Sequence, residues 1–245
     1  MSEAYIFMKI ILLLIQSLLL LLSFPASAGI SVDVTRIIFQ ESDSARGKTI
    51  GIRSAENSGS PYLIKAQVIK DILGSQVNTP FFVAPSLFRI EPGTSNQVVI
   101  MKKDSQLPHD RESLFYFRAV AVPASAKGGL KAAPVVAGEL QVASATVLKL
   151  YYRPAGLSMP SQQAFANLKF TANGKSVDVS NASPYFVTLS GIKINSSKIT
   201  LDKNATKNVI PPYSSLSYNS PLQGNNVTWT IINDYGGHEV FNGKI

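Results

Sequence analysis

The sequence contains no cysteine among its 245 residues, and it has only two histidines and one tryptophan. Without cysteine the chain can form no disulfide framework, no thiolate zinc site, no iron–sulfur cluster and no cysteine nucleophile. Two histidines argue against a multi-histidine metal centre. The hydrophobic fraction of 45% is normal for a folded protein, so these absences exclude many enzyme classes but not a globular fold.

Charge is absent from residues 10–32, a mostly apolar run that directly follows Lys9. Ala26-Ser27-Ala28 has the small-x-small form of a signal-peptidase site, so we expect residues 1–28 to be a secretory signal that is removed. Met8 is an alternative start to Met1. An uncleaved membrane anchor is the other interpretation of the run. The cleavage motif and the strand-like sequence after it favour removal, which would leave a chain without stable membrane insertion.

The formal net charge of +8 is spread along the chain, and Lys102-Lys103 is its densest cluster of cations. A solvated basic surface is the plain interpretation of this charge, and an acidic or carboxylate-bearing partner is the alternative. The sequence has no basic stripe of the kind that binds nucleic acid, so we expect no nucleic-acid partner.

Apolar and polar residues alternate with a period of two after residue 28, which is the pattern of half-buried strands. In the first half we expect strands at residues 30–39, 49–53, 62–69, 81–83, 97–102, 114–122 and 140–152. Proline- and glycine-containing turns separate them. Seven short strands in about 125 residues predict an antiparallel sandwich of immunoglobulin type.

Arg153-Pro154-Ala155-Gly156 interrupts this alternation and marks a domain boundary. Beyond it we expect strands at residues 168–171, 177–179, 185–189, 198–201, 214–218 and 227–232, with Asn173-Gly174 as a hairpin signal. The sequence therefore predicts an all-β protein with two immunoglobulin-like β-sandwich domains. The N-terminal domain would comprise residues 29–155 and the C-terminal domain residues 156–245.

No catalytic constellation is recognisable in the sequence, because G-x-S-x-G, H-E-x-x-H and phosphate-loop motifs are missing. Ser190-Gly191-Ile192-Lys193 fits the pattern S-x-x-K, but a catalytic serine–lysine pair normally opens a helix, whereas this one ends an expected strand. His109 and His238 have no serine or aspartate pattern beside them. We therefore expect no enzymatic activity, no cofactor and no metal site.

Two cations lie within apolar strands: Arg36 in residues 34–39 and Lys149 in residues 147–152. A cation in a strand usually points to solvent. The alternative is that both point into a cleft between the domains and bind an anion. Alternating strands that lead to such cations would form a docking edge for an extended peptide that ends in a carboxylate.

Five segments, in order along the chain, resemble the signature of the periplasmic pilus-assembly (fimbrial) chaperones of the chaperone–usher pathway, similar to the chaperones of P pili and type 1 pili. They are APSLFRI at residues 84–90, DRESLFY at 110–116, KLYYRP at 149–154, SPYFV at 183–187 and INDYGG at 232–237. The resemblance implies two immunoglobulin-like domains that form a boomerang, with the binding cleft at the bend.

The resemblance also implies roles for single residues. Arg36 and Lys149 would bind the C-terminal carboxylate of a pilin subunit by charge-assisted hydrogen bonds. The donor-strand positions that fill the exposed groove of the subunit match Leu140, Val142 and Ser144, although the family usually has a large apolar residue where this chain has Ser144.

Glu112, Arg153 and Asp234 match the interdomain ionic triad of the family, which sets the angle between the domains. The implied function is a periplasmic chaperone that binds, folds and caps pilus subunits by donor-strand complementation. It would deliver them to an outer-membrane usher without a cofactor, and the unloaded chaperone would self-associate to cover its apolar strand.

The alternative interpretation is a secreted β-sandwich protein with a structural or carbohydrate-binding role. A structural pilin would normally show a disulfide and an N-terminal donor extension, which this sequence lacks. A carbohydrate site would need an exposed aromatic platform, but the single tryptophan, Trp229, lies in the middle of an expected strand and is expected in the core.

Overall fold

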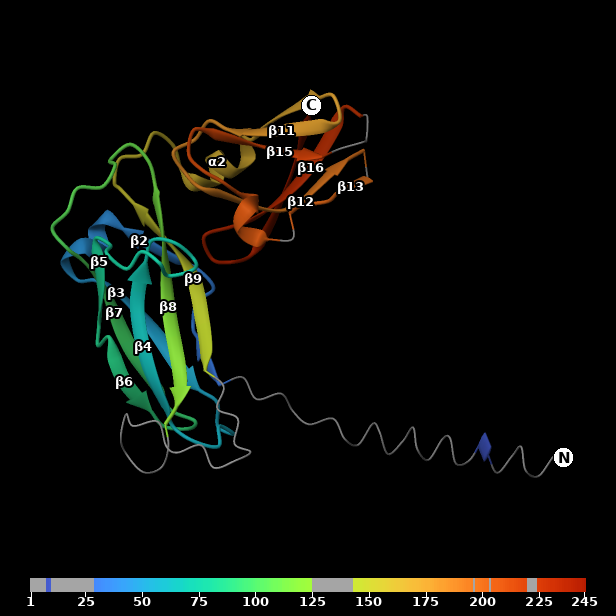
Figure 1. The fold of residues 1–245 in the computed structure, drawn as a ribbon. Helices are drawn as coiled ribbons and strands as arrows, with labels where there is room; N and C mark the ends of the chain where they lie inside the picture. The colour runs from blue at the N-terminus through green and yellow to red at the C-terminus, as the bar shows by residue number, and fades with distance from the viewer. Residues whose placement is uncertain (1–7, 10–28, 125–142, 196, 203, 220–223) are drawn as a thin grey trace.

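The computed structural model describes residues 8–9, 29–124, 143–195, 197–202, 204–219 and 224–245. Two β-sandwiches account for nearly all of these residues, and Figure 1 shows that they meet at a bend. The predicted all-β, two-sandwich fold is confirmed. Apart from Met8 and Lys9, the expected signal lies outside the described residues. Within the described ranges, no helix has the length and apolar character needed to cross a membrane.

The N-terminal sandwich consists of two sheets. One has the strand order β1-β3-β7-β5, and the other has the order β2-β9-β8-β4-β6. Among the described pairs only β2 and β9 run parallel; the others are antiparallel. The strands are β1 (Ile30–Val32), β2 (Ile37–Gln40), β3 (Lys48–Ser54), β4 (Tyr62–Ile69), β5 (Phe81–Ala84), β6 (Leu87–Ile90), β7 (Ser95–Lys102), β8 (Ser113–Pro123) and β9 (Ser144–Arg153). A short 3-10 turn, η1 (Glu41–Ala45), follows β2.

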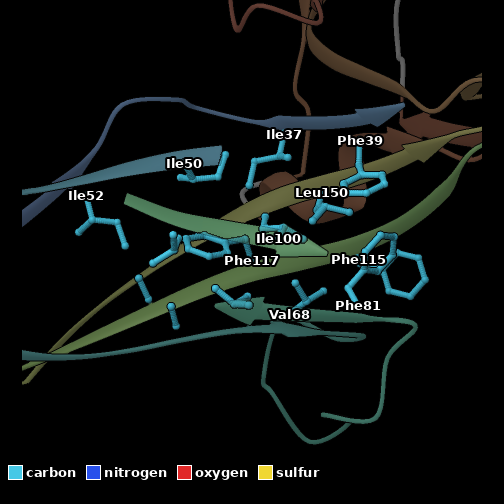
Figure 2. Packing of buried hydrophobic residues seen from close by; sticks show 14 of the residues in the cluster. Ile37, Phe39, Ile50, Ile52, Val68, Phe81, Ile100, Phe115, Phe117 and Leu150 are labelled. Carbon is cyan, nitrogen blue, oxygen red and sulfur yellow. The ribbon is translucent and has the colours of Figure 1, made fainter. Parts of the chain in front are cut away.

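The core of this sandwich forms because alternate residues of both sheets point inward. Figure 2 shows side chains from both sheets meeting between them. The ring of Phe81 packs edge-on against Phe39 and Phe115, with centroids 5.1 Å apart in both pairs. Each fully buried aliphatic side chain stabilises the fold by about 1.5–3 kcal/mol, so this core can stabilise the domain without disulfides.

The expectation of one strand over residues 30–39 is wrong. The chain forms β1 in one sheet and β2 in the other, and residues 33–36 connect them. Asp33 ends the pairing of β1 with β3, because its backbone N–H donates to the Gly51 carbonyl at 3.1 Å while its carboxylate, in place of a backbone carbonyl, accepts from the Gly51 N–H at 3.0 Å. This crossing places Arg36 directly before β2.

The C-terminal sandwich begins with a short helix, α2 (Ser161–Ala166), and also has two sheets. One has the order β10-β11-β15; the other has the order β13-β12-β16-β17, and β14 also pairs with β12. The elements are β10 (Lys169–Asn173), β11 (Ser176–Asn181), β12 (Val187–Ile194), β13 (Ser197–Ile199), η2 (Ala205–Asn208), β14 (Val209–Ile210), β15 (Ser214–Asn219), β16 (Asn226–Ile232) and β17 (His238–Lys244). The expected hairpin at Asn173-Gly174 is confirmed, because β10 and β11 pair directly and Gly174 adopts a φ of 59°.

Trp229 is buried in the core of the C-terminal sandwich, as predicted. Its Nε1–H donates to the Phe165 carbonyl at 3.0 Å, and its ring lies 5.0 Å from the ring of Phe170. The indole therefore holds α2 against the sheets. Because it is 3% exposed, it cannot serve as a carbohydrate-binding platform.

Candidate functional site

Strand β9 has a neighbouring strand on each of its two edges only near its C-terminal end. Its residues 150–153 pair with β2, whereas residues 144–149 pair with β8 alone in the described part of the chain. Figure 1 shows β9 (yellow) along the side of the N-terminal sandwich that faces the inside of the bend. The outer backbone groups of residues 144–149 therefore form an open strand edge of the kind that pairs with another chain.

The side chains of this edge alternate between two faces. Thr146 and Leu148 share a face with Leu150, which is fully buried in the domain core. Ser144, the first residue of β9, belongs to the same face and is exposed. The other two predicted donor residues, Leu140 and Val142, lie outside the described residues.

Arg36 and Lys149 lie together where the open edge ends. The Nη1 group of Arg36 donates to the Ile232 carbonyl at 2.9 Å, and its guanidinium lies 5.7 Å from the centroid of the Tyr151 ring. Partial burial and the positive charge of Arg36 lower the pKa of the Lys149 ammonium. In the described residues neither cation has a carboxylate within ion-pair distance. Two partly desolvated cations without a counterion favour binding of an anion.

Tyr151 lies beneath the Arg36 guanidinium and connects the two sandwiches. Its hydroxyl lies 3.3 Å from the Thr188 hydroxyl of β12, and its ring centroid lies 5.7 Å from that of Phe186. Burial raises the pKa of Tyr151 to about 12, against the lowering effect of Arg36. The side chain therefore stays neutral at physiological pH.

The structure brings Glu112, Arg153 and Asp234 together at the bend. Arg153 Nε donates to Glu112 Oε1 at 2.8 Å, and its two terminal nitrogens donate to the two oxygens of Asp234 at 2.8 and 2.9 Å. The second Glu112 oxygen accepts from the Phe186 N–H at 2.8 Å, and the Ser161 hydroxyl donates to Asp234 at 3.0 Å. One guanidinium thus connects a carboxylate of each sandwich.

Glu112 is the most deeply buried member of this triad, because its side chain is 2% exposed. Burial raises its pKa to about 7, although the Arg153 charge and the Phe186 N–H lower it in part. The carboxylates in turn raise the pKa of Arg153, so the guanidinium stays charged. The carboxyl group of Glu112 therefore titrates close to neutral pH.

A second contact between the sandwiches was not anticipated from the sequence. The Arg111 guanidinium lies 4.9 Å from the centroid of the Tyr213 ring, and the Tyr213 hydroxyl donates to the Asp110 carbonyl at 3.3 Å. Tyr213 follows two prolines and adopts a φ of 54°. The local sequence gives no sign that this turn reaches a residue about a hundred positions earlier.

Ser190 and His238, which looked unrelated in the sequence, are neighbours across the sheet. Ser190 Oγ lies 3.0 Å from His238 Nδ1, and it also donates to the Thr230 carbonyl at 3.3 Å. Among the described residues no carboxylate bonds to the other imidazole nitrogen. A serine–histidine pair on an exposed strand surface, without an orienting acid, lacks the third member of a hydrolase site.

Comparison with known families accounts for both sandwiches. A family model described as "Pili and flagellar-assembly chaperone, PapD N-terminal domain" matches residues 29–158, and one described as "Pili assembly chaperone PapD, C-terminal domain" matches residues 163–242. Together they span nearly all of the described chain.

Three known proteins illustrate the similarity. The chain is 32% identical over 210 residues to the probable fimbrial chaperone protein ElfD of Escherichia coli K12, covering 85% of this chain and 83% of that protein. It is 33% identical over 214 residues to the chaperone protein FimC of Escherichia coli O6:H1, covering 86% and 82%. Its fold matches a chain from the Salmonella enterica complex of the SafA pilin with the SafB chaperone, with a TM-score of 0.73, 24% identity and coverage of 91% and 99%. The chain belongs to the family of pilus-assembly chaperones.

Proposed function

We propose that this protein binds an incomplete fimbrial subunit by lending it β9 as a strand, holds the subunit folded and capped, and delivers it to an outer-membrane usher. The observation that carries this proposal is the open edge of residues 144–149, which ends at the two cations Arg36 and Lys149. Family membership supports it, as does the SafB chaperone, whose solved complex contains a pilin.

The position of the cations sets the direction of the bound strand. A guest strand on the open edge would occupy the same row as β2, upstream of it, and would meet Arg36 with one of its ends. A C-terminal carboxylate at that end is attracted by both cations, whereas an N-terminal ammonium is repelled. The guest strand therefore runs parallel to β9, in the direction that β2 already takes.

The donated side chains come from one face of β9 and of the segment before it. Leu140, Val142, Ser144, Thr146 and Leu148 share one parity, so in an extended chain they point the same way. Each aliphatic side chain that enters the open core of a subunit would stabilise the complex by about 1.5–3 kcal/mol. Ser144 offers little apolar area, so we propose that the groove is filled mainly by the residues before it and by Leu148.

The triad would hold the cleft at a fixed angle while the subunit is bound. Arg36 belongs to the N-terminal sandwich, yet it bonds to the Ile232 carbonyl of the C-terminal one. A change in the angle between the sandwiches would therefore displace the guanidinium from the end of the guest strand. We propose that Glu112, Arg153 and Asp234 are positioning residues that do not contact the subunit.

Exchange of one strand for another requires no nucleotide, metal or covalent step, because the usher only has to present a strand that binds the subunit better. The expected signal at residues 1–28 and membership of the pilus-assembly chaperone family suit a periplasmic location. Self-association of the unloaded protein would cover the open edge in the absence of a subunit.

The test is a pull-down from periplasm in which the tagged protein is co-expressed with the fimbrial subunits of its host, with the bound proteins identified by mass spectrometry. We expect the wild type to retain a fimbrial subunit and the Arg36→Ala/Lys149→Ala variant to lose it. Arg53→Ala/Lys198→Ala is the matched control, because it removes two exposed cations outside the cleft.

Retention by wild type and control, with loss in the cleft variant, supports the proposal. Equal retention by all three would remove the carboxylate anchor while leaving a chaperone role. Recovery of no subunit with the wild type, when candidate subunits are co-expressed, would refute the chaperone function itself.

A further inference from the structure

The turn that joins β16 to β17 presents Tyr235 to solvent, with the residue 94% exposed. This is the highest exposure among the large hydrophobic residues that the structure describes. The tyrosine belongs to the INDYGG segment, in which Ile232 binds Arg36 and Asp234 binds Arg153. An aromatic ring with so little covering area has no packing function within the described protein.

The backbone that carries this ring is tightly held. The Asn233 side-chain oxygen accepts from the Tyr235 N–H at 3.1 Å and from the Gly237 N–H at 2.8 Å, while its amide donates to Glu239 at 2.7 Å. The Asn233 N–H also bonds to the Gly237 carbonyl, and the Gly236 N–H bonds to the Asn233 carbonyl. Binding through Tyr235 would therefore order one side chain and no loop, which keeps its entropic cost low.

The turn lies against the end of the open edge of β9. Gly236 adopts a φ of 85°, and a Cβ there would overlap the side chain of Thr35, the residue before Arg36. At the start of the turn, the Ile232 carbonyl holds the Arg36 guanidinium. Tyr235 thus belongs to a turn that packs beside Thr35 and Arg36, where a strand bound to β9 has to end.

We infer that Tyr235 packs on a side chain at the carboxyl end of the bound subunit and makes the protein select for a large apolar residue there. This inference rests on the proposed function. The cations fix the terminal carboxylate, so the last two side chains of the guest lie at the same end of the cleft as Tyr235. A tyrosine ring offers a large apolar surface with a polar tip, which suits a contact at the edge of an interface.

The test uses two ten-residue peptides of alternating valine and threonine that end in a free carboxylate. They differ only in the last two residues, which are both leucine in one and both glycine in the other. Because adjacent side chains of a strand point to opposite faces, changing both residues places a leucine or a glycine on the face that meets Tyr235. Affinities are measured by titration calorimetry for wild type, Tyr235→Ala, Tyr235→Phe, Arg36→Ala and the control Leu73→Ala, which truncates an 86% exposed residue of the N-terminal sandwich.

We expect the wild type to prefer the leucine peptide about tenfold, the size of a typical aromatic contact. Tyr235→Ala should lose this preference, Tyr235→Phe and Leu73→Ala should keep it, and Arg36→Ala should weaken both peptides.

An unchanged preference in Tyr235→Ala, with Arg36→Ala still impaired, would overturn this inference and leave the proposed function intact. Equal loss in Tyr235→Phe and Tyr235→Ala would overturn ring packing as the cause. Binding that is absent in the wild type, or is insensitive to Arg36→Ala, would overturn the carboxylate anchor and this inference with it.

Discussion

Replacing Arg153 with methionine would leave two carboxylates at the bend without their cation. Within the described ranges, Glu112 would keep only the Phe186 N–H, and Asp234 would keep only the Ser161 hydroxyl. Removing one partner of a buried ion pair costs about 3–5 kcal/mol, because the remaining carboxyl group must either stay ionised without its cation or take up a proton at a pH above its usual pKa. The Glu112 side is expected to dominate, since its side chain is 2% exposed against 21% for Asp234.

The assay is urea unfolding followed by two signals. Fluorescence of Trp229 reports on the C-terminal sandwich alone, because it is the only tryptophan, while far-ultraviolet circular dichroism reports on both sandwiches. We expect Arg153→Met to lower the midpoint of the tryptophan transition, because the C-terminal sandwich loses its attachment. Small-angle X-ray scattering should show a wider range of angles between the sandwiches.

A second substitution separates charge burial from lost packing. In Arg153→Met/Glu112→Gln the uncompensated charge is gone, while the Gln side-chain oxygen can still accept from the Phe186 N–H. We expect the double variant to recover at least half of the lost stability. Arg53→Met is the matched control, because it removes an exposed ion pair with Glu56 that lies within the N-terminal sandwich, away from the bend. A loss below about 1 kcal/mol in Arg153→Met, or a double variant no better than the single one, would refute this reasoning.

Three further predictions test other parts of the structure. Because the pKa of Glu112 rises from 4.5 to about 7, its contribution to stability is complete below pH 4.5 and is lost as pH rises through 7. Glu112→Gln should therefore remove this pH dependence. Melting temperatures of both proteins at pH 5 and 7.5 would show whether stability falls with pH in the wild type alone. Ser144→Leu should tighten subunit binding about tenfold by adding a buried aliphatic group, as measured by competition between the two chaperone variants for one subunit. Trp229→Ala should destabilise the C-terminal sandwich by about 3–5 kcal/mol through the cavity it leaves, and a loss below about 1 kcal/mol in urea unfolding followed by circular dichroism would show that the indole is not needed for packing.

The alternation of apolar and polar residues predicted most strands, because each strand buries one face and so has an apolar residue at every second position. It failed where the chain changes sheets. The core-facing positions are even-numbered up to Val34 and odd-numbered from Ile37 onward, and this change of phase within residues 30–39 marks the crossing from one sheet to the other. The helix α2 was missed because six residues are too few to show helical periodicity. Strand β17 was missed because Val240 and Phe241 are its only large apolar residues.

Some residues of the candidate site could be predicted from the sequence, and others could not. The cations Arg36 and Lys149 could be singled out from the sequence because they interrupt apolar strands, and the resemblance to a family supplied their partner. The contacts of Tyr213 with Arg111 and of Ser190 with His238 could not be foreseen, since they join segments far apart in the chain. Such pairs depend on strand order and register, which a single sequence does not record. The role of the donor positions stays a prediction.

The parallel pairing of β2 with β9 has a consequence for measurement along the chain. Because β2 fills the edge from Leu150 onward, the open stretch ends at Lys149, and its described part, residues 144–149, is about 20 Å long at about 3.3 Å per residue. The residues of any strand that binds there take their positions along β9 from the end that lies at Arg36. One extra residue in this stretch would turn every upstream side chain to the opposite face, whereas two would restore the face and shift it by about 7 Å. The crossing from β1 to β2 therefore sets the register of any strand that binds to β9.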